Sequence, residues 1–267
     1  MFNERDFHGA TYAITGAVSG MGAACSRLLI EVGATVIGID RNAVAGEAMR
    51  QELGERFDFR ALDITDEDAV TAMAGQLAVD YDAVDGLVNC AGVFTHNQRA
   101  ENLPVADFRR AFEVNTIGTF LVCRAFFSLL QKAKSGAGVV NIASQAALVS
   151  LPEQGAYTAS KGALTALTRS MAIDWARDNV RVNAVCPGFT VTEMSERDLN
   201  DELRDAVRRR VPLGRLFRAE EMARVIVFLA SPLASAMTGA VVPVDGGWTA
   251  GEAVLPTWGR VEQIGQL

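Results

Sequence analysis

The fold is decided by the stretch TYAITGAVSGMG, residues 11–22. Its first five residues are rich in β-branched and aromatic side chains, which predicts a buried strand, and Gly16 follows this strand directly. From Met21 to Val32 the apolar residues recur at helical spacing. The glycines therefore stand in a tight turn between a strand and a helix.

The same alternation of strand and helix continues along the chain. Further strands are predicted at 34–39, 57–62, 84–88, 138–142, 180–185 and 240–244, and helices at 42–54, 104–134, 154–177 and 219–230, with another opened by Thr65. Continuous apolar strands between helices imply an α/β fold with a parallel sheet covered on both faces. The chain has 267 residues, 49% of them hydrophobic, and no linker, so we expect a single domain over 1–267.

Charge and composition exclude several classes of partner. The net charge of −7 disfavours nucleic acid and an anionic membrane surface as partners. Residues 1–6 are charged and do not form a signal peptide, and no apolar run approaches the roughly 18 residues of a membrane span. The four cysteines lack metal-ligand spacing, so we expect small buried side chains and no metal site. A cytoplasmic protein is the expectation.

The glycine turn suits the diphosphate of a dinucleotide. Backbone N–H groups at a helix N-terminus bind such an anion, and a Cβ atom would obstruct its approach. A glycine-rich loop without a ligand can show a similar composition, but the position between strand and helix favours a nucleotide site. The residues expected to contact the cofactor here are Gly16, Ser19, Gly20, Met21 and Gly22.

The pattern Thr-Gly-xxx-Gly-x-Gly resembles the cofactor turn of the short-chain dehydrogenase/reductase family. Asp40 follows the second strand, where a carboxylate can accept both ribose hydroxyls of NAD and repels the 2′-phosphate of NADP. The same carboxylate could instead cap the helix that Asn42 begins, and Arg41 beside it could neutralise a phosphate. We expect NAD to be the preferred cofactor, with Arg41 in contact with it.

Three more segments resemble cofactor-binding parts of the family. The Asp63-Ile64 pair is similar to its aspartate beside the adenine ring, although a helix cap would look the same. The segment 89–92 is similar to its Asn-Asn-Ala-Gly, with Cys90 in place of the second Asn, and 183–192 is similar to the Pro-Gly turn and the carboxamide-binding segment beside the nicotinamide. The resemblance thus adds Asn89, Ala91, Gly92, Pro187, Gly188, Thr190 and Thr192.

Tyr157 and Lys161 form the clearest catalytic motif. Positions i and i+4 share one face of a helix, and a nearby ammonium lowers a tyrosine pKa, which yields a general acid or base. The chain has only three tyrosines and three lysines, so this pairing carries weight. Ser144, at a strand end, could hold a substrate oxygen. Asn115 lies inside a predicted helix, where it could bind a water linked to the lysine or simply bend the helix.

Asn115, Ser144, Tyr157 and Lys161 match the family's Asn-Ser-Tyr-Lys tetrad, and the resemblance spans about residues 9–248. It implies a Rossmann-like doubly wound sheet of seven strands, often in tetramers. It also implies that Tyr157 takes the proton of a secondary alcohol while hydride passes to the nicotinamide, with Ser144 on the oxygen. Lys161 would lower the Tyr157 pKa and bind the ribose, and Asn115 would support a water relay.

Two other functions compete. A 3-oxoacyl-type reductase shares these motifs, but it commonly uses NADP and carries basic residues for its carrier protein, so Asp40 and the negative charge disfavour it. A non-catalytic nucleotide-sensing protein would be expected to lose the tyrosine or the lysine. The substrate is open: a polyol, sugar, hydroxy acid or cyclic alcohol fits. Specificity is expected in 93–102, 145–154 and 194–211, with candidate contacts at His96, Gln145 and Gln154.

Assembly follows from surplus apolar residues on two predicted helices, 104–134 and 154–177. A helix that covers a sheet buries one face, so apolar residues beyond that face suggest a partner, although a wide contact within one subunit is the alternative. By resemblance we expect a homotetramer. The tail, 251–267, carries Trp258 and several aliphatic residues, so we expect it to pack across a subunit interface near a substrate loop.

Overall fold

A seven-stranded parallel sheet forms the centre of the protein. The computed structural model describes residues 6–193 and 200–251. The strands are β1 (Thr11–Thr15), β2 (Thr35–Asp40), β3 (Phe57–Ala61), β4 (Gly86–Asn89), β5 (Ala137–Ile142), β6 (Val180–Pro187) and β9 (Val241–Val244). They lie in the order β3-β2-β1-β4-β5-β6-β9, and every pairing is parallel. The predicted fold class, a Rossmann-like single domain, is confirmed.

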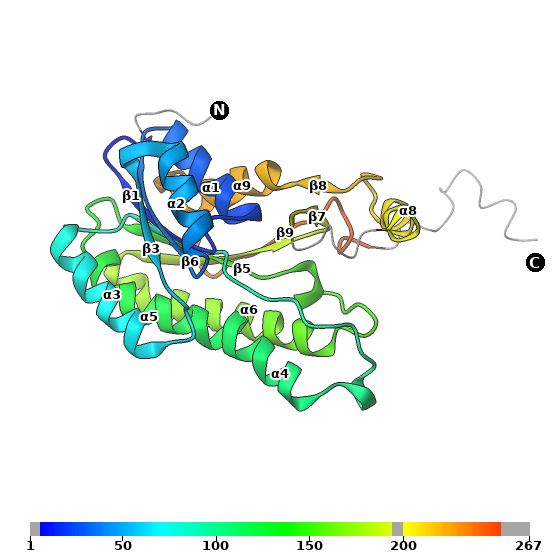
Figure 1. The fold of residues 1–267 in the computed structure, drawn as a ribbon. Coiled ribbons are helices and arrows are strands. Elements are labelled where there is room, and N and C mark those ends of the chain that lie inside the picture. The colour runs from blue at the N-terminus through cyan, green and yellow to red at the C-terminus, as the bar shows by residue number, and fades with distance from the viewer. Residues whose placement is uncertain (1–5, 194–199, 252–267) are drawn as a thin grey trace, which may run out of the picture.

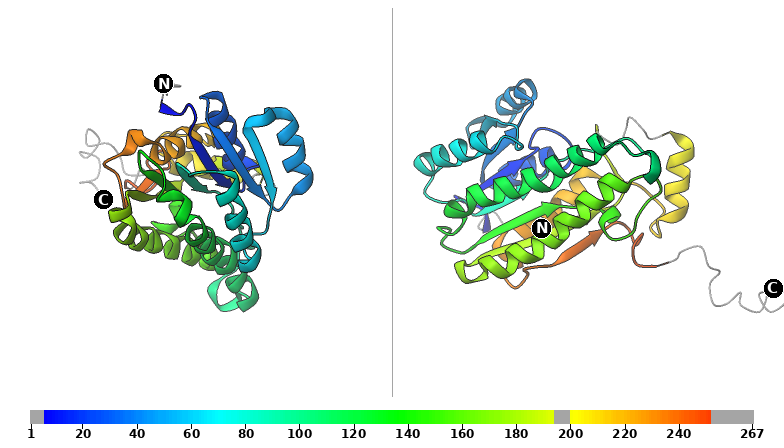
Figure 2. Two further views of the ribbon diagram at one scale, coloured as in Figure 1. Left: turned by 90° about the vertical axis from the view of Figure 1, so that its left-hand side faces the viewer. Right: turned by 90° about the horizontal axis from the view of Figure 1, so that it is seen from below.

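Helices cover both faces of the sheet (Figure 1). One layer holds α1 (Gly20–Glu31), α2 (Ala43–Leu53) and α9 (Ala219–Ala230); the other holds α3 (Glu67–Asp80), α4 (Val105–Phe112), α5 (Thr119–Leu130) and α6 (Gly155–Trp175). Seen from below, the long helices of the second layer lie across the sheet (Figure 2). The short helix α8 (Asp201–Arg210) stands at the end of the molecule where β6 ends.

Two hydrophobic cores result from the alternation of side chains along the strands. Val36 of β2 packs with Leu29 and Ile226 in the core beneath α1 and α9. The next residue, Ile37, faces the opposite side and packs with Phe126 and other residues of the second layer. Because neighbouring residues of a strand point to opposite faces, a continuous apolar run buries both faces of the sheet.

The predicted helix over 104–134 is interrupted. It comprises α4, a π-helical segment at Glu113–Gly118 and α5, which ends at Leu130. The π turn admits an extra residue without changing the apolar composition of the helix, so the sequence analysis did not separate it from α4 and α5. Such turns occur often at functional sites, and this one contains Asn115.

The same helical run corrects the expectation about membrane spans. Val105–Leu130 is long and apolar enough to cross a bilayer, with a mean hydropathy of 1.3 over its most apolar window, half of which is buried. Length and composition alone are weak evidence for a span. Leu121, Phe126 and Leu129 of this run pack in the second core, as in the core helix of a globular domain.

One helix end and one small sheet also differ from the prediction. The helix predicted at 154–177 runs from Gly155 to Trp175 and finishes in a 3-10 turn. A separate two-stranded sheet pairs β7 (Thr190–Val191) with β8 (Phe217–Arg218). Strands of two residues are too short to produce a periodic pattern. This pairing ties the segment after β6 to the start of α9, at the carboxyl edge of the main sheet.

Candidate active site

The glycine turn between β1 and α1 forms a cradle with no space for side chains. Gly16 has φ +67°, and a Cβ atom there would lie 2.8 Å from the backbone nitrogen of Ala91 at the end of β4. A Cβ on Gly22 would collide with the carbonyl oxygen of Gly16. The glycines therefore let the turn pack tightly against the end of β4 beside a helix N-terminus, the place at which a dinucleotide diphosphate binds in sheets of this kind.

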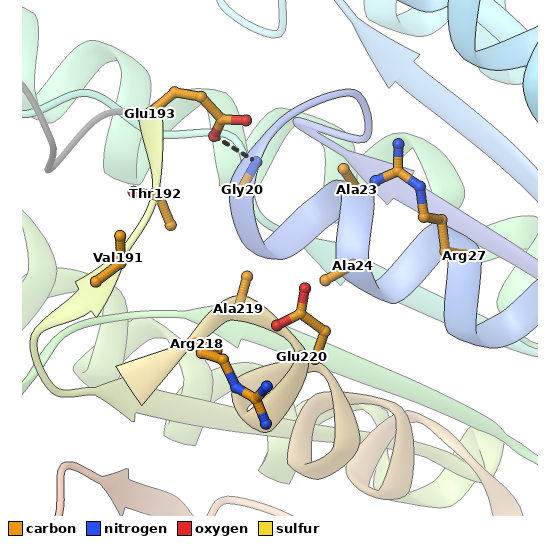
Figure 3. A pocket seen from close by; sticks show the side chains of 10 residues that line it. All are labelled: Gly20, Ala23, Ala24, Arg27, Val191, Thr192, Glu193, Arg218, Ala219 and Glu220. Carbon is orange, nitrogen blue, oxygen red and sulfur yellow. Dashed lines mark hydrogen bonds between the residues drawn. The ribbon is translucent and has the colours of Figure 1, made fainter. Parts of the chain in front are cut away.

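The N-terminus of α1 is capped from a distant part of the chain. Ser19 occupies the N-cap position without a side-chain hydrogen bond, and the N–H of Gly20 donates to Oε2 of Glu193 at 3.0 Å. Figure 3 shows this contact at the edge of a pocket of ≈ 390 Å³ between α1, the segment after β7 and the start of α9. Glu193 escaped the sequence analysis because no local pattern links residues so far apart.

The predicted carboxamide-binding segment also lies against this turn. A Cβ on Gly20 would lie 3.2 Å from the methyl group of Thr192, so the chain after β7 passes close over the start of α1. Thr190 is buried, and its hydroxyl donates to the carbonyl oxygen of Gly188 at 3.1 Å. Met21 is half-buried in the first turn of α1. The structure thus brings both glycine turns to one edge of the sheet.

Asp40 and Arg41 mark the far end of this edge. The half-buried Asp40 accepts a hydrogen bond from the N–H of Asn42 at 2.9 Å, and Asn42 in turn caps α2. The carboxylate of Asp40 therefore shapes the local turn but does not itself cap the helix. Arg41 is exposed.

Asp63 takes part in a similar turn. Its Oδ1 accepts hydrogen bonds from the N–H and the hydroxyl of Thr65, which lower the pKa of Asp63, and the cations Arg41 and Arg110 lower it further. Ile64 is buried, and its side chain lies under Gly118 of the π-helical segment. Two cations thus act on the carboxylate that was predicted to lie by the adenine ring.

Asn89 points into the protein. Its Nδ2 donates to Oδ1 of Asn141 at 2.9 Å and contacts the Sγ of Cys123 at 3.2 Å, and the side chain is buried. Asn89 therefore ties β4 to β5 and α5, and only its backbone faces the cofactor edge. The N–H of Ala91 donates to the hydroxyl of Thr15 at 3.2 Å, which anchors the segment after β4 to β1.

Gly92 brings the cofactor edge and the tetrad together. A Cβ atom on it would lie 3.2 Å from Oδ1 of Asn115 and 3.3 Å from Nζ of Lys161. Pro187 and Gly188 end β6, and the N–H of Gly188 donates to the carbonyl oxygen of Val244 at 3.0 Å, which fixes this turn to β9. The carboxyl ends of β4 and β6 therefore flank the tetrad.

Lys161 is almost fully buried in α6. Its Nζ donates to the carbonyl oxygen of Ile142 at 2.7 Å, and burial lowers the pKa of Lys161 to about 8. The ammonium lies 5.9 Å from the centre of the Tyr157 ring, over its face. Tyr157 and Lys161 occupy the same side of α6, as the i, i+4 spacing predicts.

The expected effect of Lys161 on Tyr157 is not found. Burial raises the pKa of Tyr157, and the hydrogen bond with Ser144 opposes this shift only in part. The ammonium faces the ring and bonds to Ile142, so it does not act on the phenolic oxygen at close range. The structure therefore holds Tyr157 as a protonated phenol at neutral pH, contrary to the prediction of a lowered pKa.

Ser144 and Asn115 complete the group. Ser144 ends the segment after β5 and caps a short 3-10 turn at Gln145–Ala147, its Oγ accepting from the N–H of Ala146 at 3.1 Å. The fully buried Asn115 binds both backbone groups of Val93, accepting from its N–H at 2.8 Å and donating to its carbonyl at 3.0 Å. Its Nδ2 also donates to Ser160 at 3.0 Å. All four tetrad residues thus meet at one place.

The three predicted substrate contacts lie in different environments. His96 is exposed, Gln145 is buried with Oε1 lacking a partner, and Gln154 is half-buried and forms a β-bridge with Gln98. Residues 194–199 of the third predicted loop lie outside the described residues. Phe94 lies in the first of the loops in which specificity was expected, but the packing of its ring on that of Tyr157 was not predicted.

The cysteines are free thiols in the structure. Cys25, Cys123 and Cys186 are buried and Cys90 is half-buried, which agrees with their interpretation as small packing residues. Within the described ranges, 6–193 and 200–251, no three residues of metal-ligating type cluster together.

Comparison with known proteins places this arrangement in context. Residues 16–249 match the protein family described as Enoyl-(Acyl carrier protein) reductase. The chain is 37% identical to D-threitol dehydrogenase of Mycolicibacterium smegmatis, covering 90% of this chain and 93% of that protein. It is 40% identical to galactitol 2-dehydrogenase (L-tagatose-forming) of Cereibacter sphaeroides, with coverages of 90% and 95%.

The chain is also similar to a solved structure. The 3-ketoacyl-(acyl-carrier-protein) reductase from Brucella melitensis, complexed with NADH, superposes with a TM-score of 0.84 at 32% identity. The superposition covers 91% of this chain and 99% of that chain. The similarity therefore extends over the cofactor edge and the tetrad alike.

Proposed function

The chain belongs to the short-chain dehydrogenase/reductase family and is an oxidoreductase, and on this premise we propose that it is an NAD-dependent dehydrogenase of secondary alcohols. The observation that carries the proposal is the contact at Gly92, where the cofactor edge meets Asn115 and Lys161. A hydride acceptor bound along that edge would lie beside the phenol of Tyr157.

NAD would supply the acceptor for the hydride at its nicotinamide ring. The glycine turn at 16–22 would hold the diphosphate, and the turn at Pro187–Gly188 with Thr190 and Thr192 would hold the nicotinamide. These residues fit the group because the turn lies at a helix N-terminus and its close packing admits no side chain on Gly16 or Gly22.

Tyr157 is proposed as the group that moves the proton. Burial raises the pKa of Tyr157, so the phenol is protonated at neutral pH and is ready to donate to the oxygen of a ketone. In the oxidation of an alcohol the same oxygen must first lose its proton, so oxidation is expected to speed up as pH rises. Ser144, which is hydrogen-bonded to Tyr157, would hold the substrate oxygen beside the phenol.

Lys161 and Asn115 are proposed to support this step. The ammonium of Lys161 would bind the nicotinamide ribose, since it lies next to Gly92 at the cofactor edge. Asn115 uses its amide to hold Val93 and Ser160, so its first role is to fix the loop and α6 relative to each other. A water bound at its second Oδ1 lone pair would complete the proposed relay.

NAD is preferred over NADP in this proposal because of Asp40. Its carboxylate stands at the end of β2, where the adenosine ribose would lie, and a 2′-phosphate there would meet a like charge. Arg41 and Arg110 act against this preference, since both are close enough to lower the pKa of Asp63. The preference is therefore a testable balance between one carboxylate and two cations.

A 3-oxoacyl-type reductase is the second candidate. The match to the Brucella melitensis reductase, which was solved with NADH, supports it. Its substrate would carry the ketone on an acyl thioester. The names of the other relatives, dehydrogenases of threitol and galactitol, favour small alcohols. A non-catalytic nucleotide-sensing role is disfavoured by the complete tetrad.

The test is a panel of substrates. Secondary alcohols (polyols, sugars, hydroxy acids and cyclic alcohols) and a 3-oxoacyl thioester are each offered with NAD or NADP, and the absorbance of the reduced nicotinamide is followed. We expect oxidation of at least one alcohol class with NAD. Turnover of the thioester alone would select the second candidate, and turnover by Tyr157→Phe equal to that of the native protein would refute the proposal.

We also propose that the protein is a cytoplasmic homotetramer. Apolar side chains remain exposed on α4, α5 and α6 and on the π segment, namely Phe108, Ile117, Phe120 and Ile173. These helices would pair across a two-fold axis, and the tail at 251–267 would cross an interface; residues 252–267 lie outside the described residues. Light scattering measures the mass directly, and a monomer would contradict the proposal.

A further inference from the structure

Phe94 lies directly against the catalytic tyrosine. The centres of the Phe94 and Tyr157 rings are 4.9 Å apart and their planes are inclined by 59°. Tilted aromatic pairs at this distance are attractive beyond the area that they bury. Phe94 is only half-buried, so part of its surface remains accessible beside the phenol.

The loop that carries Phe94 is fixed on the side of Asn115. That amide binds the N–H of Val93 at 2.8 Å and its carbonyl at 3.0 Å, so the backbone immediately before Phe94 is fastened to the π-helical segment. Thr95, which follows Phe94, is buried. The ring therefore has a defined position, unlike a side chain on a loose loop.

A second fastening closes the loop over the start of α6. The N–H of Gln98 donates to the carbonyl oxygen of Glu153 at 2.8 Å, and Gln98 forms a β-bridge with Gln154. Glu153 has φ +63°, a left-handed conformation that non-glycine residues rarely adopt and that tends to persist where surrounding contacts impose it. One end of the loop is thus held to the π-helical segment and the other to the residues just before α6, whose first turn carries Tyr157.

A second apolar segment follows the other tetrad residue in this region. Leu148 and Val149 come after the 3-10 turn that Ser144 begins, and both are exposed. Phe94 itself presents an aromatic surface without hydrogen-bonding groups beside Tyr157. A hydroxyl placed against such a surface loses its bonds to water and gains none in return.

We propose that Phe94 is a specificity-determining residue that receives the hydrocarbon part of the substrate. The substrate class is then a secondary alcohol whose carbinol carbon bears an aliphatic or alicyclic group, in preference to a chain hydroxylated at every carbon. This inference rests on the proposed function, because it assigns the substrate of the same Tyr157 site.

The ring has a second effect that can be measured without turnover. Burial raises the pKa of Tyr157, and the Phe94 ring packs against the ring of this residue. The other groups that face it are the Ser144 hydroxyl, the Cys186 thiol, which also raises the pKa, and the Lys161 ammonium over the ring. Removal of the Phe94 ring admits water and leaves these groups in place, so the pKa of Tyr157 should fall.

The experiment compares Phe94→Ala and Phe94→Leu with the native protein and with the control variant Phe228→Ala. Phe228 is a half-buried aromatic residue of α9 that packs on the core beneath α1 and α9. We expect kcat/KM for cyclohexanol to fall about 10–200-fold in Phe94→Ala relative to 2-propanol, since that is the range for removal of apolar contact in a pocket. Phe94→Leu should retain most of the preference, and Phe228→Ala all of it. Circular dichroism and NADH fluorescence confirm that each variant is folded.

Titration of phenolate absorbance supplies the second readout. The chain has three tyrosines, so the difference from Tyr157→Phe isolates the signal of Tyr157. The midpoint of the Tyr157 titration should move to lower pH in Phe94→Ala and should remain at the native value in Phe228→Ala. Equal losses for cyclohexanol and 2-propanol, or an unmoved midpoint, would overturn the inference. A native protein that oxidises no alcohol would instead overturn the proposed function and, with it, the substrate class.

Discussion

Replacement of Lys161 by methionine should stabilise the protein while abolishing its turnover. Burial lowers the pKa of Lys161 from its ordinary value of 10.5 to about 8, so the fold keeps an ammonium where water would solvate it better. At about 1.4 kcal/mol per pKa unit, the charged form costs the folded state about 3 kcal/mol near neutral pH. Methionine has a similar length and carries no charge to desolvate.

The hydrogen bond from Lys161 to the carbonyl oxygen of Ile142 stabilises the native protein and opposes this gain. Its loss leaves a carbonyl oxygen without this donor, which costs about 1–2 kcal/mol. The net expectation is that Lys161→Met raises the free energy of unfolding by about 1–2 kcal/mol near pH 7. The residue would then be an example of stability given up for function.

The sign of the pH dependence separates this explanation from better packing. Below about pH 8 both folded and unfolded Lys161 carry the proton, so the full cost is present. As pH rises from about 8 towards 10.5 the folded state loses its proton first, and native stability rises relative to the variant. The advantage of Lys161→Met should therefore disappear by about pH 10.

Urea unfolding without nucleotide measures the free energy of unfolding of each protein near pH 7 and near pH 10. Protein concentrations are kept equal because assembly adds to stability. Lys161→Arg, which keeps a charge, serves as the control and should not stabilise the protein. The reasoning is refuted if Lys161→Met is less stable than the native protein near pH 7. It is equally refuted if the difference in the free energy of unfolding between the variant and the native protein is the same near pH 7 and near pH 10.

Three further predictions concern other parts of the chain. Asp40→Ser should shift preference from NAD towards NADP, measured as the ratio of kcat/KM values; a native protein that turns over NADP as well as NAD would contradict the role of Asp40. Asn115→Ala removes the bonds to Val93 and Ser160 and should lower the melting temperature and kcat together, whereas unchanged kcat would confine Asn115 to packing. Deletion of 251–267 should change mass, melting temperature or KM; a variant identical in all three would show that the tail has no packed role.

The sheet was predictable because its signal is local and continuous. Strands such as β2 and β4 are short apolar runs buried along most of their length, whereas β3 alternates apolar and charged residues and is only partly buried. The pairing of Tyr157 and Lys161 was predictable because they are one helical turn apart, whereas Ser144 and Asn115 were assigned from the family resemblance. The π segment escaped because an extra residue in a turn does not change the composition of a helix.

Contacts between distant segments could not be predicted. Glu193 reaches the N–H of Gly20, and Phe94 reaches Tyr157, through the arrangement of loops at the carboxyl edge of the sheet. The inward direction of Asn89 depends on Asn141 of the neighbouring strand, which no single segment reveals. The pKa of Tyr157 was predicted in the wrong direction because helical spacing does not show that Lys161 bonds elsewhere.

Direct transfer of the carbinol hydrogen is the measurement closest to the central claim. A secondary alcohol deuterated at its carbinol carbon is incubated with NAD and the protein, and the reduced nicotinamide is examined by mass spectrometry. The account predicts one deuterium in the nicotinamide with the native protein and none formed with Tyr157→Phe, although that variant still binds NADH. Reduced nicotinamide without the label, or label transfer that persists in Tyr157→Phe, would contradict it.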